Sequence, residues 1–212
     1  MSIIHKTTVK PGKLELLADW MRHQPWYRGS APQLDHLAGG FRLDDPDGAV
    51  GCEFLLVTDT SDGSPYFAAL AYRGAPLEGA DDRLITTAEH GVLGQRWVYD
   101  GAGDPVVLTQ LLALMRGDVR AHAQNEHDAL DDSISPTPTI GNSFAGAEFT
   151  RHGSDAAGRA VAVDAGANGR CTVRFHHDLS TAPRDADHPG VRTSWEANGE
   201  HVRGLVVSAH PA

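Results

Sequence analysis

The chain has 212 residues, of which 41% are hydrophobic and 22% are charged, and this composition is ordinary for a soluble globular protein. The formal net charge is −10, so the chain as a whole repels phosphate backbones, which argues against nucleic-acid binding. The apolar runs are too short for a membrane helix and the first residues lack the layout of a signal peptide, so we expect a cytoplasmic location and no membrane contact.

The first predicted helix covers residues 13–23. Leu14, Leu17 and Met21 recur there at helical spacing, and Pro25 disfavours helix at the residue before it. A short strand at residues 3–4 is predicted ahead of this helix.

Strands are predicted next, because short apolar segments alternate with strong turn signals. Asp-Pro-Asp-Gly at residues 45–48 is such a turn, since proline fixes φ and Gly48 tolerates a positive φ. Two tight turns in succession favour an antiparallel meander. The predicted strands cover residues 41–43, 50–57, 66–74 and 96–100.

A second helix is predicted after a glycine bend at residues 101–103. Asp104 suits the N-cap, Pro105 suits the first helical position, and Gly117 suits the stop. Apolar residues between them recur at helical spacing.

The second half of the chain is predicted to be almost entirely β. Residues 119–138 are polar and acidic, which is typical of a linker or a long surface loop. A strand over residues 144–150 and two hairpins come after it, with turns at "DAGANG" and at Asn198-Gly199. We therefore expect a unit over residues 1–118, a linker over 119–138, and a β-rich part over 139–212 that is separate or completes the same domain.

The pattern as a whole predicts an α+β fold with a curved, mainly antiparallel sheet and a few packed helices. Cys52 and Cys171 both lie in strand-like alternation, so buried thiols are expected, and a bridge between them is left open.

The segment "HHDL" at residues 176–179 imitates the His-x-Asp of a kinase catalytic loop. Pro183 stands where such a loop needs a metal-holding Asn, and no second metal-binding motif comes after it. The segment is therefore predicted to be a solvated strand end. The alternative is an enzyme of unknown type that uses His176, His177 and Asp178, the densest titratable cluster.

Other sites of chemistry are not predicted. His122 and His127 are five residues apart in a polar segment, which is a poor spacing for metal ligands, so we expect no metal and no cofactor. Phosphate-binding lysine loops and nucleophile elbows are absent from the sequence, and its lysines are Lys6, Lys10 and Lys13. No catalytic residue is therefore assigned.

Aromatic residues are concentrated in the first half of the chain. Trp26, Tyr27, Trp97 and Tyr99 are core or interface residues on one interpretation, and on the other they line a surface that stacks on sugar rings. We take these four as candidate ligand-binding residues.

Several ordered segments in residues 1–117 resemble the N-terminal cap domain of maltokinases, and more closely the stand-alone cap-like proteins related to it. They are "IIHKTTVKPGKLELLADWM", "QPWYRG", "GGFRLDDPDGAVGCEFLLVTDT", "YRGAPLEGA" and "EHGVLGQRWVYDGAGDPV". The resemblance implies a curved antiparallel sheet with helices, which precedes the kinase lobes in those enzymes and does not hold their catalytic groups. Maltose phosphorylation is not implied.

The resemblance leads to two expected functions. The first is a non-catalytic cap-like module, an interaction or regulatory protein with a protein partner in trehalose, maltose or α-glucan metabolism. The alternative is a protein that binds a small ligand, a sugar or an apolar metabolite, on the concave face of the sheet.

Overall fold

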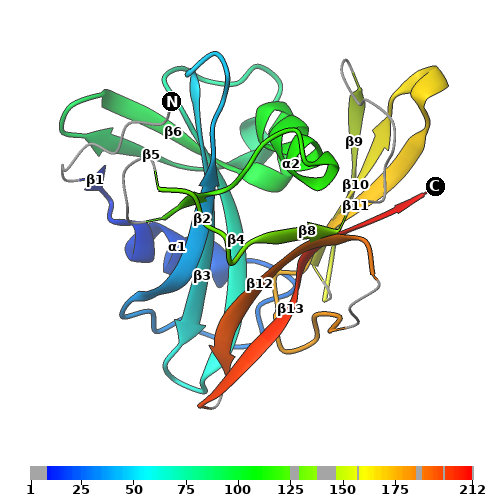
Figure 1. Ribbon diagram of the computed structural model, residues 1–212. Helices are drawn as coiled ribbons and strands as arrows, with labels where there is room; N and C mark the ends of the chain where they lie inside the picture. Colours follow the sequence, from blue (N-terminus) through cyan, green and yellow to red (C-terminus); the bar gives the residue numbers. More distant parts are fainter. Residues whose placement is uncertain are drawn as a thin grey trace.

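A computed structural model describes residues 9–124, 129–137, 147–156, 158–184, 188–197 and 199–211. It contains two antiparallel sheets and two α-helices, α1 (Lys13–Met21) and α2 (Pro105–Arg116) (Figure 1). The predicted α+β fold with curved antiparallel sheets is confirmed. The strand predicted at residues 3–4, His127 and Asn198 lie outside the described residues.

The first sheet, sheet A, is built mainly from the first half of the chain. Its strands pair in the order β1-β5-β6-β4-β3-β2-β7, and every pairing is antiparallel. Their bounds are β1 Val9–Lys10, β2 Leu37–Leu43, β3 Val50–Asp59, β4 Ser64–Arg73, β5 Leu84–His90, β6 Gly94–Asp100 and β7 His122–Ala123.

The second sheet, sheet B, is built from the second half, in the order β8-β12-β13-β11-β10-β9. Both predicted hairpins are confirmed, since β10 pairs with β11 and β12 pairs with β13. The bounds are β8 Ser135–Thr137, β9 Glu148–Asp155, β10 Gly158–Asp164, β11 Arg170–Phe175, β12 Gly190–Ala197 and β13 Glu200–Pro211.

Helix α2 begins and ends as its sequence predicts. The Asp104 carboxylate accepts hydrogen bonds from the backbone N–H groups of Val106 (2.9 Å) and Val107 (3.3 Å), which otherwise lack partners in the first turn. Gly117 ends the helix with a φ of 82°, a conformation that favours glycine. Both ends of α2 are therefore fixed, and its apolar face packs into the core in one orientation.

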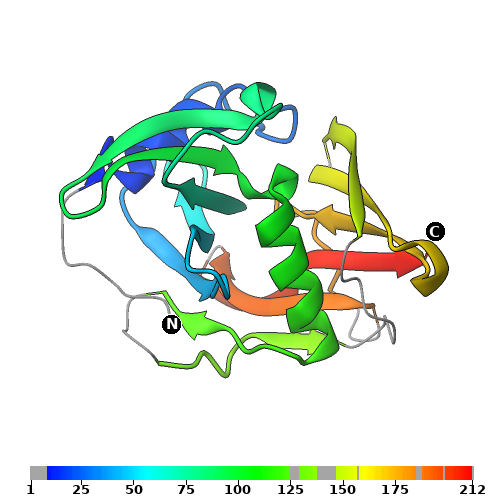
Figure 2. The same cartoon turned by 90° about the horizontal axis from the view of Figure 1, so that it is seen from above.

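The main hydrophobic core lies between the two sheets. Figure 2 shows α2 between them, and apolar residues of α2 and of both sheets form one buried cluster. Examples are Phe54 and Phe67 of sheet A, Leu111 of α2, and Val173 and Phe175 of sheet B. Burying each such side chain contributes roughly 1.5–3 kcal/mol, so the two halves stabilise each other through this core.

A second apolar cluster lies on the opposite face of sheet A, where α1 packs (Figure 2). It contains Leu17 and Met21 of α1 together with Leu55 and Val98 of the sheet. Sheet A is therefore covered on both faces by apolar packing.

The two cysteines are free thiols, and both are buried in the core between the sheets. Burial raises the pKa of the Cys171 thiol to about 11. Across the described parts of the chain, no helix combines the length and apolar character needed to cross a membrane.

Three strands of sheet A were not predicted, namely β1, β5 and β7, and β5 is the longest of them. Residues 84–90, "LITTAEH", form β5, although their polar residues gave no clear alternation. This strand forms by antiparallel pairing with β6, in which Thr87 lies opposite Trp97, and it has no strong apolar pattern of its own. The predicted turn at Asp45–Gly48 is confirmed, with a φ of 67° at Gly48.

Gly40 offers a test of the sheet A geometry. It has a φ of 140°, and a Cβ placed on it would lie 2.2 Å from the carbonyl oxygen of Phe54 on the paired strand. Gly40→Ala is therefore expected to destabilise the protein by roughly 1–3 kcal/mol, measured by urea unfolding. Gly48→Ala is the control, because Gly48 also has a positive φ but no atom lies within 4 Å of its added Cβ. Equal destabilisation of the two variants would contradict this explanation.

Candidate functional site

Two segments that stand out in the sequence contact each other in the structure. "QPWYRG", at residues 24–29, comes after α1, and "HHDL", at residues 176–179, comes after β11. Backbone hydrogen bonds hold the second segment along β4: Phe67 N–H donates to the His177 carbonyl at 2.9 Å, and Leu179 N–H donates to the Pro65 carbonyl at 3.1 Å. The second half of the chain is thereby tied to sheet A.

Aromatic rings from both halves pack together at this contact. The Trp26 and His177 rings are stacked, with centroids 4.5 Å apart and planes inclined by 16°. Trp20 meets both rings edge-on, at 5.4 Å from Trp26 and 6.1 Å from His177, and Tyr66 lies 6.1 Å from Trp26. We call Trp20, Trp26, Tyr66 and His177 the junction cluster. Such contacts combine apolar burial with favourable ring geometry.

His177 is the polar centre of the junction cluster. It is fully buried, and its Nδ1 lies 2.8 Å from the carbonyl oxygen of Phe67. A carbonyl only accepts, so Nδ1 carries the proton and donates, and this contact fixes the tautomer. Burial lowers the pKa of His177 to about 3, with a smaller contribution from the positive charge of Arg159. The ring is therefore neutral at neutral pH.

His176 points to a different environment, inside sheet B. Its Nε2 lies 2.9 Å from the hydroxyl of Ser208 on β13, and Nε2 of His210 lies 3.2 Å from the same hydroxyl. Burial lowers the pKa of His176 to about 4, and the nearby charge of Arg174 acts in the same direction. This imidazole is also neutral at neutral pH.

Asp178 is buried and held by charged and polar partners. Its carboxylate forms an ion pair with Arg28 and accepts hydrogen bonds from the N–H (3.0 Å) and hydroxyl (2.6 Å) of Ser180. Arg28 in turn donates to the Ser180 hydroxyl at 2.8 Å. The carboxylate therefore fixes "QPWYRG" against the "HHDL" segment.

A buried ion pair lies close to the same contact. The Arg159 guanidinium of β10 lies 2.5 Å from the carboxylate of Asp100, at the end of β6, with side-chain exposures of 8% and 2%. Arg159 also donates to the Gln24 side chain at 3.4 Å. Sequence reasoning missed this pair, because nothing local at either residue indicates a partner in the other half of the chain.

The prediction that "HHDL" is a solvated strand end was wrong. His176, His177 and Asp178 are all buried, because the second half folds back onto sheet A and covers the end of β11. The alternative, an enzyme that uses these three residues, stays a prediction. His176 contacts Ser208, His177 contacts Phe67 and Trp26, and Asp178 contacts Arg28, so the three side chains serve three separate structural contacts.

The four candidate ligand-binding aromatics do not form one surface. Trp26 and Tyr27 are buried in the apolar cluster beside α1, where the Tyr27 hydroxyl donates to Asp59 at 2.6 Å. Trp97 and Tyr99 pack on the other face of sheet A, where the Tyr99 hydroxyl accepts from the Leu77 N–H at 2.9 Å. Trp97 is the one of the four that is half-buried rather than buried. Their binding of a ligand stays a prediction.

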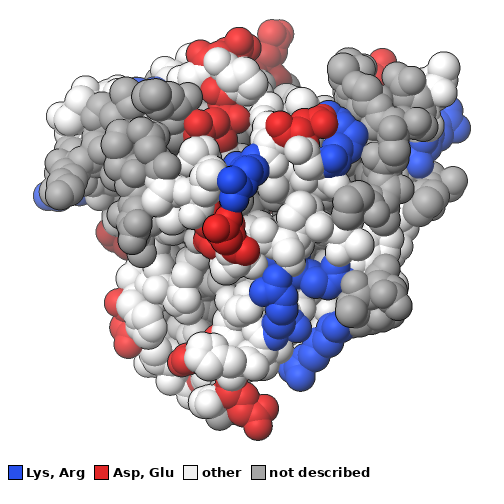
Figure 3. All heavy atoms as spheres, viewed as in Figure 1, with Lys and Arg blue, Asp and Glu red and all other residues white. Residues whose placement is uncertain are grey.

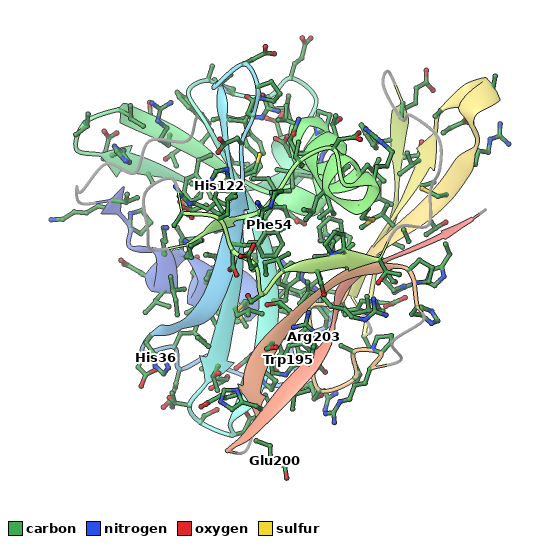
Figure 4. All side chains as sticks on the ribbon, in the orientation of Figure 1. His36, Phe54, His122, Trp195, Glu200 and Arg203 are labelled. Carbon is green, nitrogen blue, oxygen red and sulfur yellow. The ribbon has the colours of Figure 1, made fainter. Side chains whose placement is uncertain are left out.

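His122, considered as a metal ligand, lies on β7 near the middle of the view in Figure 4. Its Nε2 is 3.7 Å from a carboxylate oxygen of Asp44. Within the described ranges, His, Cys, Asp and Glu side chains do not gather in threes or more in an arrangement that could hold a metal ion.

Comparison with known families assigns the first half of this arrangement. Residues 20–104 match the maltokinase N-terminal cap domain. The matched segment runs from the last turn of α1 to the N-cap of α2 and includes β2 to β6 of sheet A. The family resemblance predicted from the sequence is confirmed over this cap segment. A search of curated proteins found no match to the chain.

The cap segment contributes Trp20, Trp26 and Tyr66 of the junction cluster, and the part beyond it contributes His177. This arrangement buries polar groups and pairs them with partners across the contact between the cap segment and the second half of the chain. These contacts hold the cap segment and sheet B together.

Proposed function

We propose that this protein is a non-catalytic cap-like module that acts by binding a protein partner in trehalose, maltose or α-glucan metabolism, in the cytoplasm. The observation that carries the proposal is the match of residues 20–104 to the maltokinase cap domain, combined with a junction that uses the titratable residues for structural contacts. The proposal treats the two halves as one domain, which their shared core supports.

The chemistry around Asp178 supports the non-catalytic part of the proposal. A kinase-type base must accept a proton from the substrate hydroxyl, and so its carboxylate has to reach the substrate. The Asp178 carboxylate is instead buried between Arg28 and Ser180. Lys13, one of the three lysines of the chain, forms an ion pair with Glu53 at 2.8 Å.

Partner capture tests the proposed function. The tagged protein is incubated with lysate of its source cells grown on maltose or trehalose, cross-linked and recovered, and we expect an enzyme of α-glucan or trehalose metabolism to be enriched. The control is the double variant His177→Asp with Trp26→Ala, which disrupts the junction cluster. Recovery of no specific partner, together with calorimetric binding of maltose or trehalose, would instead favour the small-ligand function and contradict the proposal.

Phosphoryl transfer provides a second prediction. With maltose, magnesium and labelled ATP, we expect no labelled sugar above a heat-inactivated control, because Asp178 is held by Arg28 and Pro183 occupies the position of the metal-holding Asn. The measurement is separation of labelled sugar from ATP by thin-layer chromatography. Turnover that Asp178→Asn abolishes would contradict this prediction and identify Asp178 as a base.

A further inference from the structure

A group of arginines lies on the outer face of sheet B, away from the core. On β12, Val191 and Trp195 face the core, so Arg192 and Ser194 between them face outward. Arg203 of β13 is the register partner of Ser194 and shares this outward face. Arg184 is exposed and comes directly after Pro183, whose carbonyl accepts from the Leu205 N–H at 3.0 Å, so it lies beside β13. We call Arg184, Arg192 and Arg203 the arginine patch.

Hydroxyl groups hold two members of this patch, Arg192 and Arg203, in place. Arg203 is exposed and donates to the hydroxyls of Ser194 (3.3 Å) and Ser135 and to the Ser133 carbonyl (3.3 Å). Among the described residues, the contacts of Arg203 are with these neutral oxygens and not with a carboxylate. Its positive charge is therefore positioned without being neutralised, which lowers the entropy that a binding partner has to overcome.

Arg192 lies behind this surface and is buried. It donates to the Thr137 hydroxyl and to the His188 carbonyl, both at 2.5 Å. Because Ser135 and Thr137 are both on β8, the two arginines are connected through the same short edge strand. Strands β8, β12 and β13 thus form one support for the patch.

The surface charge of this face is uneven. In Figure 3 the Lys and Arg side chains gather over β12 and β13, while the acidic side chains are spread over other parts of the face. Figure 4, in the same orientation, places Arg203 on this part of sheet B. The chain as a whole has a net charge of −10, so this basic area is opposite in sign to the chain as a whole.

We propose that the two exposed arginines of this patch, Arg184 and Arg203, are the docking surface for an acidic segment, rich in Asp and Glu, of the partner protein, and that the buried Arg192 supports them. The inference rests on the proposed function, which it deepens by naming the chemistry of the partner. Arginine is enriched at protein interfaces and pairs with carboxylates in a bidentate manner. The net charge of −10 disfavours binding of an acidic segment to the chain as a whole, so local positive charge at Arg184 and Arg203 determines where such a segment binds.

The test uses a fluorescein-labelled oligo-glutamate peptide and fluorescence anisotropy at low salt. We expect saturable, salt-sensitive binding that weakens by about fivefold or more in the double variant Arg184→Gln with Arg203→Gln. The matched control is Arg22→Gln with Arg170→Gln, which removes the same charge from two exposed arginines at the end of α1 and on β11, and is expected to bind as the unmodified protein does. Thermal unfolding verifies that both double variants are folded.

Three results would overturn the proposal: no binding of the peptide, equal weakening in the two double variants, or displacement of the peptide by inorganic phosphate at similar concentrations. The last result would assign the patch to a small oxyanion. Failure of this inference is distinct from failure of the proposed function. If the partner captured from the lysate is retained equally by the Arg184 and Arg203 variant, the proposed function stands and the docking surface lies elsewhere.

Discussion

Replacing Arg159 with methionine is expected to lower the free energy of unfolding by about 3–5 kcal/mol, because it removes a cation that is paired with a buried carboxylate. Asp100 is 2% exposed in its side chain, and the Arg159 guanidinium lies 2.5 Å from it. The carboxylate cannot relax into water, since it is also fixed by accepting the Ala102 N–H at 3.0 Å. The loss is measured by urea unfolding at neutral pH.

Two controls separate this effect from a general effect of losing arginine. Arg170→Met removes a similar pair, but the Arg170 and Asp164 side chains are 70% and 41% exposed, so no measurable change is expected. The double variant Asp100→Asn with Arg159→Met removes both charges and is expected to recover part of the lost stability. A small loss in Arg159→Met, comparable to that in Arg170→Met, would show that the pair is hydrated in solution.

The same variant tests whether the two halves of the chain unfold together. Arg159 belongs to β10 of sheet B and Asp100 to β6 of sheet A, and the core between the sheets is shared. A single cooperative transition at lower urea concentration is expected when one domain contains both sheets. Two separate transitions would instead indicate two domains with a contact between them.

Local sequence signals were sufficient to predict most of the elements. The helix from Pro105 to Arg116 was predicted because its cap, first residue, apolar stripe and stop glycine all lie within one short segment. The hairpins of sheet B were predicted in the same way, from alternation on both sides of a turn. In these cases the residues that determine an element lie within that element or directly beside it in the sequence.

The candidate site could not be predicted in the same manner, because it depends on contacts distant in sequence. Trp26 and His177 were each noticed, but nothing in either segment indicates that their rings stack. The sequence predicted a solvated strand end at His176, but this residue is buried. The strand ends there, and residues 177–179 pack against β4 through backbone hydrogen bonds that have no sequence pattern. Asp178 in particular looked like a solvated carboxylate because its partner, Arg28, comes from the opposite half.

Lowering the pH from 7 to about 4 is expected to destabilise the protein through His177 and His176. In the folded state, burial lowers the pKa of His177 to about 3 and that of His176 to about 4, below the ordinary value of 6.5. Above pH 6.5 both rings are neutral in the folded and unfolded states, so they make no pH-dependent contribution. Below pH 6.5 the unfolded chain binds protons that the folded protein does not, and stability falls as the pH decreases.

The loss has a defined window for each residue. For His176 it ends near pH 4, and for His177 it continues to about pH 3, with a full effect on the order of 5 kcal/mol for His177. The Phe67 carbonyl favours the charged form of His177 and offsets part of the effect of burial, whereas Arg159 acts against that charged form. Arg174 and His210 act against the charged form of His176. Carboxylates also titrate in this range, so a variant is needed to isolate the histidine contribution.

His177→Asn isolates it, because an asparagine amide can still donate to the Phe67 carbonyl, as Nδ1 does, and cannot be protonated. The variant is expected to be less stable than the unmodified protein at pH 7, since the stacking on Trp26 is lost, and to lose less stability between pH 6.5 and 4. Free energies of unfolding from urea titrations at intervals across this range give the two slopes. His201→Asn, at a side chain that is 83% exposed, is the control and is expected to leave the slope unchanged. Parallel pH curves for the His177 variant and the unmodified protein would contradict this prediction. They would mean that His177 gains a proton in the folded state as readily as in the unfolded chain. The junction cluster would then have to open to water well above pH 4.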